Sequence, residues 1–151
     1  MIRFEPDTWR DALLRPIAMA APDGGVYVEF IAPDFRFVFV LALLGLIALF
    51  WAFRKRNAAA FKPTAILLTC VAIAFVPWLA TSGNGRYFIA TLLAAGPLCI
   101  ALVDFLPVTR GFRLTLATTL LMVQAFVVYE SDSLKSWGMS QWREGPYFQI
   151  D

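Results

Sequence analysis

The chain has 151 residues, of which 60% are hydrophobic and 16% charged, and its 13 basic and 11 acidic side chains leave a net charge of +2. So few charges exclude an ordinary water-soluble domain, which must cover itself with polar side chains. The small net charge gives no support for binding to nucleic acid, and a chain with no histidine and two cysteines, Cys70 and Cys99, offers no zinc or haem site. We therefore expect an integral membrane protein without a metal or cofactor, whose first partners are membrane lipids.

The N-terminal segment, residues 1–36, contains the stretch DTWRDALLRPIAMA, in which apolar residues recur at roughly helical spacing. Acidic residues and prolines interrupt the segment, so it does not have the form of a signal peptide. We expect a short amphipathic helix that lies on the membrane interface, ended by the turn residues APDGG.

Four apolar blocks follow, and each is close to the lower limit of about 17 residues for a helix that crosses a bilayer. Their apolar runs are continuous rather than alternating, which favours helices over barrel strands. The predicted spans are residues 37–53, 64–80, 87–103 and 114–129. The expected fold is all-α and polytopic, with a four-helix transmembrane domain over residues 37–129. A polar, aromatic-containing C-terminal tail, residues 130–151, would lie outside the membrane.

The interior of these blocks contains no charged residue, and Gln124 is the one strongly polar side chain well inside a span. Ion paths and proton relays need ionisable groups at depth, so a channel or pump is disfavoured. Pro77 and Pro97 predict kinks in the second and third spans. The spacing of Ala90 and Ala94 predicts that the third span packs closely against another helix.

The orientation follows from the loops at 54–63 and 104–113, which carry most of the basic residues between spans. The positive-inside rule places these loops in the cytoplasm, so the turn at 81–86 and the C-terminal tail lie on the outer side. Arginines in the N-terminal segment weigh against this orientation.

The turn TSGNGRY carries Arg86 at the start of an apolar helix, where the helix dipole mildly disfavours a cation. One interpretation is a phosphate site, in which Arg86 and the first amides of the third span bind the anion. Asn84 and Ser82 would add hydrogen bonds, and Tyr87 would lie at the headgroup level. The other interpretation, which the residues alone favour, is that Arg86 reaches to lipid phosphate and Tyr87 anchors the helix.

The stretch FVPWLATSGNGRYFIATLLAAGPLCIALV resembles the late transmembrane hairpin of integral-membrane glycosyltransferases of the GT-C fold. This superfamily includes protein O-mannosyltransferases and lipid A aminoarabinose transferases. In that hairpin, a helix ending in an aromatic residue, Leu, a small residue and Thr-Ser leads into an Arg-Tyr pair that opens an apolar helix. The corresponding residues are Trp78, Leu79, Ala80, Thr81, Ser82, Arg86, Tyr87 and Pro97. With the preceding basic stretch RKRNAAAFKPTAILL, the resemblance covers roughly residues 36–103.

The resemblance implies an enzyme of the bacterial inner membrane that takes a sugar from a polyprenyl-phosphate carrier on the outer face. Arg86 would contact the carrier phosphate and Tyr87 would support it. The family's catalytic carboxylate has no counterpart here, since Asp7 and Asp11 match nothing in that motif, and the transfer needs a base. No catalytic residue is therefore assigned.

We expect a fragment or half of such an enzyme, which would need further helices or a partner chain for catalysis. The alternative is a small, non-enzymatic membrane scaffold or assembly subunit. Its interfaces with a helical partner or a second copy would be the face formed by Ala90 and Ala94 and the aromatic tail.

Overall fold

The computed structural model describes residues 4–21, 33–53 and 61–131, and within these ranges the chain forms helices and no strand. The helices are α1 (Trp9–Ala18), α2 (Arg36–Phe53), α3 (Phe61–Thr81), the 3-10 helix η1 (Gly85–Phe88), α4 (Ile89–Asp104) and α5 (Arg110–Glu130). The all-α prediction is confirmed for the described part of the chain. Most of the predicted cytoplasmic loop at 54–63, the APDGG turn and the tail at 130–151 lie outside these residues.

Three helical segments of the described residues are long and apolar enough to cross a membrane: Pro63–Thr81, Gly85–Asp104 and Arg110–Glu130. The prediction of a multi-pass membrane protein is therefore confirmed, with three candidate spans among the described residues. The first predicted span corresponds to α2, whose apolar part, Arg36–Trp51, is shorter than the other three. A fourth complete span therefore stays a prediction.

The helix boundaries have local causes that the sequence contains. The side chains of Thr8 and Thr109 cap α1 and α5 by accepting a hydrogen bond from the backbone amide three residues later. Pro77 and Pro97 lie inside α3 and α4, and both helices continue past them. Neighbouring helices make this tolerable in a membrane, because they can satisfy carbonyl groups that a proline leaves without a donor.

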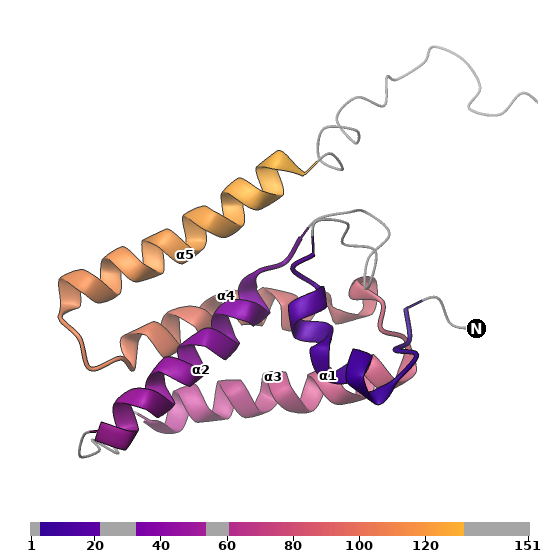
Figure 1. Ribbon diagram of the computed structural model, residues 1–151, viewed down its shortest axis with the longest axis horizontal. Helices are drawn as coiled ribbons and strands as arrows, with labels where there is room; N and C mark the ends of the chain where they lie inside the picture. Colours follow the sequence, from indigo (N-terminus) through magenta and orange to yellow (C-terminus); the bar gives the residue numbers. More distant parts are fainter. Residues whose placement is uncertain (1–3, 22–32, 54–60, 132–151) are drawn as a thin grey trace, which may run out of the picture.

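The central helix of the bundle is α4, which packs against α2, α3 and α5. Figure 1 shows α4 running between α3 and α5, with α2 crossing in front. Its buried residues are Ala95, Leu98, Cys99, Leu102 and Val103. The close packing predicted for this helix is thus confirmed, although the two alanines differ: Ala94 packs against the core and Ala90 is exposed.

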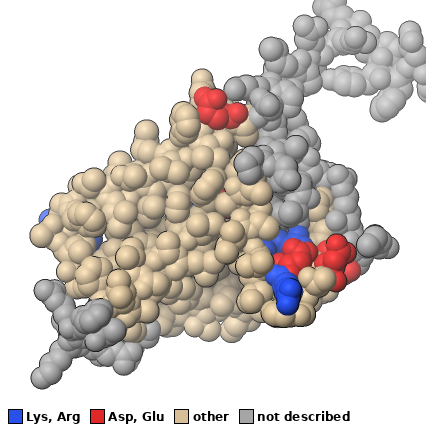
Figure 2. All heavy atoms as spheres, in the orientation of Figure 1, with Lys and Arg blue, Asp and Glu red and all other residues tan. Residues whose placement is uncertain are grey.

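The amphipathic helix α1 packs against α2. Arg15 is buried and pairs with Asp11 at 2.8 Å, whereas Trp9, Leu13 and Ile17 are more than half exposed. These three apolar side chains are four residues apart and so form one stripe along the outer face of the helix. Figure 2 shows that charged side chains gather near α1, while most of the described surface on that face carries none.

Candidate functional site

The turn between α3 and α4 is held by hydrogen bonds within itself. Ser82 Oγ accepts from the amide of Asn84 at 3.3 Å, and Asn84 Oδ1 accepts from the amide of Arg86 at 2.9 Å. The carbonyl oxygen of Asn84 accepts from Trp78 Nε1 at 2.7 Å and from the amide of Tyr87 at 3.1 Å. Asn84 and Ser82 therefore shape the turn, and their contact with a phosphate stays a prediction.

Glycine is required at position 83, where φ is +57° and the backbone is left-handed. The Gly83 amide donates to the carbonyl oxygen of Trp78 at 2.9 Å, and a Cβ at Gly83 would collide with the backbone carbonyl of Phe4. The Trp78 ring stacks on the Phe88 ring with centroids 4.2 Å apart. The backbone of Phe4 and the stacked rings of Trp78 in α3 and Phe88 in η1 thus clamp the turn.

Arg86 and Tyr87 are exposed on this clamped turn, Tyr87 by 80%. They follow each other in η1, at the end of the bundle where α3 ends and α4 begins. A guanidinium group presents five N–H donors in a planar fork that matches a phosphate, and a phenol can add one more hydrogen bond. The turn can therefore present donors from two side chains to an anion at this end of the bundle.

A second polar cluster, which the sequence analysis did not single out as a site, ties α2 to α4. Nε and Nη2 of Arg36 donate to the carboxylate of Asp34 at 2.9 and 2.6 Å, and Nη1 donates to the carbonyl oxygen of Leu92. Asp34 is only 2% exposed. Leu92 belongs to α4, so the ion pair lies about 10 Å along the candidate span that begins at Gly85. A charge at such depth is stable when it is paired and hydrogen-bonded in this way.

Gln124 connects α5 to the same cluster. Its Oε1 accepts from the amide of Phe35 at 2.8 Å, and its Nε2 donates to the carbonyl oxygen of Pro33 at 3.1 Å. From α4, Cys99 Sγ donates to the carbonyl oxygen of Arg36 at 3.4 Å. We call Asp34, Arg36 and Gln124 the polar clasp, because together they join the start of α2 to α4 and α5.

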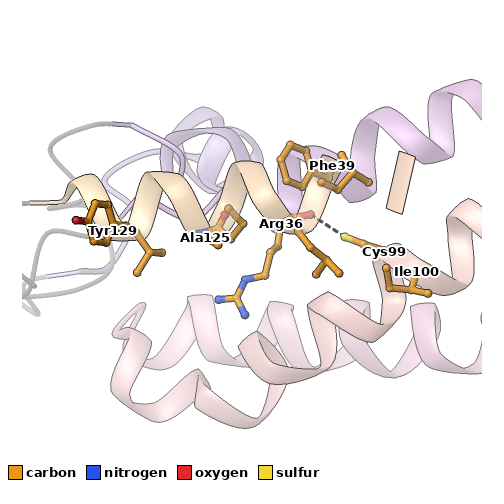
Figure 3. Close-up of a pocket in the computed structure, with 10 residues that line it drawn as sticks. Arg36, Phe39, Cys99, Ile100, Ala125 and Tyr129 are labelled. Atoms are coloured by element: carbon orange, nitrogen blue, oxygen red, sulfur yellow. Dashed lines mark hydrogen bonds between the residues drawn. The ribbon is translucent and has the colours of Figure 1, made fainter. Parts of the chain in front are cut away.

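A groove of about 510 Å³ runs beside the polar clasp, between α2, α4 and α5. Figure 3 shows the side chains around it: Arg36 and Phe39 from α2, Cys99 and Ile100 from α4, and Ala125 and Tyr129 from α5. Apart from the clasp residues, Cys99 and the Tyr129 hydroxyl, its walls are hydrocarbon and aromatic side chains. Within the described residues, no group of three or more His, Cys, Asp or Glu side chains could hold a metal ion.

The sequence contained two signals for the polar clasp. Gln124 stood out as a strongly polar side chain inside an apolar block, and the structure gives it two partners on the backbone before α2. Arg36 lay one residue before the block predicted at 37–53, and in the structure it is the first residue of α2. The partners of Arg36 could not be predicted, because Leu92 is 56 residues away in the chain.

Comparisons of the chain with protein families, with curated proteins and with solved structures find no match.

Proposed function

We propose that the protein binds the phosphate of a polyprenyl-phosphate carrier at Arg86 and Tyr87 and forms part of a GT-C-type membrane glycosyltransferase. The observation that carries the proposal is the exposure of these two side chains on a clamped turn at one end of the bundle. The similarity of the α3–α4 hairpin to that superfamily supports the choice of ligand.

In this proposal the ligand contacts come from the exposed side chains, while the rest of the turn positions them. The guanidinium of Arg86 would bind two phosphate oxygens at once, and the Tyr87 hydroxyl would donate to a third. Asn84 and Ser82 would act mainly through the turn, because Asn84 Oδ1 accepts from the amide of Arg86 and Ser82 Oγ accepts from that of Asn84. The proposed ligand, a polyprenyl phosphate, has an anionic head for these side chains and a long apolar chain that would stay in the bilayer.

The proposed orientation places the loops at 54–63 and 104–113 in the cytoplasm of a bacterium and the turn at 81–86 and the C-terminal tail outside the inner membrane. It rests on the positive-inside rule. The exposed stripe of Trp9, Leu13 and Ile17 on α1 supports an interfacial position for that helix on the same side as the turn. Catalysis would require a base from further helices or from a partner chain.

Binding of polyprenyl phosphate to the purified protein in nanodiscs tests the proposal. We expect Arg86→Ala and Arg86→Lys each to weaken binding about tenfold, which is about 1.4 kcal/mol, because both remove the planar fork. Arg110→Ala is the matched control, since Arg110 is also exposed but begins α5 at the opposite end of the spans. Equal binding by wild type, both Arg86 variants and the control would refute the proposed role of Arg86.

A second candidate function, a scaffold or assembly subunit, is favoured by one observation: no residue of α5 is buried, although it spans Arg110–Glu130. Its faces away from α4 could therefore receive a partner helix or a second copy. The face formed by Ala90 and Ala94 is a weaker interface, since Ala94 already packs against the core. A scaffold would keep its partners in the Arg86 variants, which distinguishes the two functions.

A further inference from the structure

The N-terminal segment touches the backbone of the turn that carries Arg86. Phe4 is only 4% exposed, and its backbone carbonyl lies so close to Gly83 that a Cβ there would collide with it. The positive φ of Gly83 would by itself also permit asparagine, which adopts left-handed backbone more readily than other side-chain-bearing residues. Glycine is therefore needed at position 83 for the close approach of Phe4 as well as for the backbone conformation.

The other end of the segment packs against side chains that support the turn. Met19 is fully buried and belongs to the same buried cluster as Trp78 and Phe88, the two stacked rings of the turn. Its carbonyl oxygen accepts from the amide of Asp34 at 2.9 Å. Figure 1 shows α1 at the end of the bundle where α3 ends. Residues 4–19 are thus fastened at both ends, on the turn and in the core.

Between these two ends the segment is held in shape by its own hydrogen bonds. Thr8 Oγ1 accepts from the amide of Asp11 at 3.2 Å. The Asp11 carboxylate accepts from Arg15 Nη2 at 2.8 Å and from the amide of Asp7 at 3.3 Å. The residues before α1 and its first turn therefore form a folded unit with a defined path, which keeps Phe4 beside the turn.

We infer that residues 4–19 form an N-terminal clip that holds the turn in the shape that presents Arg86 and Tyr87, with Phe4 as a positioning residue. The amides of Arg86 and Tyr87 bond to Asn84 within the turn, so the place of both side chains depends on the backbone against which Phe4 packs. A site that is ordered before its ligand arrives loses less free energy on binding. The role of Phe4 in phosphate binding rests on the proposed function, whereas the hold of the clip on the turn does not.

Hydrogen exchange of single amides, measured on the purified full chain in micelles, tests the clip without a ligand. Phe4→Ala removes a buried ring, so the amides of Gly83 and Arg86 should exchange about tenfold faster, while those of α4 stay unchanged. Phe4→Leu should restore most of the protection. Phe112→Ala is the matched control, since Phe112 is an exposed phenylalanine of α5. Unchanged exchange in the turn, or equal acceleration throughout α3 and α4, would overturn the inference.

Gly83→Asn separates the contact with Phe4 from backbone strain. Asparagine tolerates the left-handed conformation, but its Cβ would meet the Phe4 carbonyl, so this variant should also speed exchange in the turn. The double variant Phe4→Ala/Gly83→Asn should be no worse than the more severe single variant, because both changes break the same contact. Effects of the two changes that simply add would contradict the clip.

Binding of polyprenyl phosphate in nanodiscs tests the positioning role. Phe4→Ala should weaken binding about fivefold, because the turn must then be ordered on binding, while Phe4→Leu and Phe112→Ala stay close to wild type. If Arg86→Ala binds like wild type but Phe4→Ala still speeds exchange in the turn, the phosphate site fails and the clip stands. If Arg86→Ala weakens binding and Phe4→Ala does not, the positioning role of Phe4 is overturned.

Discussion

The candidate spans Gly85–Asp104, which contains α4, and Arg110–Glu130, which is α5, are similar in length and apolar character. Yet α4 and α5 are attached to the protein in different ways. Five residues of α4 are buried, and it packs against three other helices. No residue of α5 is buried: Leu116, Ala117 and Leu120 pack partly buried against the core, Gln124 bonds to the backbone before α2, and Arg113 pairs with Asp104.

This difference shows what hydropathy can and cannot reveal in a membrane protein. Lipid tails are as apolar as leucine, so exposure to lipid costs an apolar helix little, and close packing rather than hydrophobicity decides which helix is central. The small residues of α4, with Ala95 fully buried, let neighbouring helices approach it closely. By contrast, α5 leaves a groove beside it.

The largest effect is expected from the polar clasp at α4. Asp34→Ala should destabilise the protein by about 3 kcal/mol, because it removes the carboxylate partner of Arg36 at depth in the bundle. Unfolding in mixed detergent micelles, followed by tryptophan fluorescence, measures the change. Asp104→Ala is the matched control, since its carboxylate is also ion-paired but 80% exposed.

The double variant Asp34→Ala/Arg36→Leu sharpens this test. Removing both charges leaves no unpaired ion, so it should recover part of the stability that Asp34→Ala loses. If Asp34→Ala and Asp104→Ala cost the same, the pair between Asp34 and Arg36 does not hold α2 against α4.

The direct comparison of the two helices uses one substitution twice. Leu98→Ala in α4 should cost about 2 kcal/mol, because Leu98 is fully buried and its loss leaves a cavity. Leu114→Ala in α5 should cost less than about 0.5 kcal/mol, because Leu114 is 69% exposed and lipid replaces its contacts. The same micelle unfolding experiment measures both, and equal costs would mean that α5 is packed as tightly as α4.

The elements of the fold could be predicted well, because long apolar runs determine where membrane helices form. The blocks at 64–80 and 114–129 correspond to α3 and α5, and the helices extend three or four residues further at the N-terminal end and one residue further at the C-terminal end. The backbone turn could also be predicted from its glycines, and Gly83 is indeed left-handed. Helices and turns of this kind depend on neighbours in the sequence.

The side-chain partners were predicted less well than the helices, for one local and one long-range reason. Asn84 Oδ1 and Ser82 Oγ accept from backbone amides two residues away, which the sequence analysis did not predict, and their hydrogen bonds to a phosphate stay a prediction. Short polar side chains often bond to nearby backbone, which is a physical reason to expect this arrangement in any tight turn. The hydrogen bonds of Arg36 and Gln124 could be predicted only if the crossing of α2 with α4 and α5 were already known.

A smaller effect is expected where α5 meets the polar clasp. Gln124→Leu removes two hydrogen bonds, at about 0.6 kcal/mol each in a membrane, so the cost should be about 1 kcal/mol. The amide of Phe35 loses its acceptor, and hydrogen exchange of that amide should become faster. Unchanged exchange at Phe35 would show that α5 is not fastened at this point.

The smallest effect is expected at the other end of α5. Arg113 Nη1 donates to the carboxylate of Asp104 at 2.7 Å and to the Asp104 carbonyl oxygen at 2.8 Å, and the carboxylate is mostly exposed. Water and salt screen such a pair, so Arg113→Ala should cost about 0.5 kcal/mol in the micelle unfolding experiment, and less at high salt. A cost for Arg113→Ala larger than that for Gln124→Leu would reverse the order of the two attachments. The pair between Arg113 and Asp104 would then hold α5 more firmly than the hydrogen bonds of Gln124 do. The part of α5 that carries Gln124 and lines the groove would be the more weakly attached part.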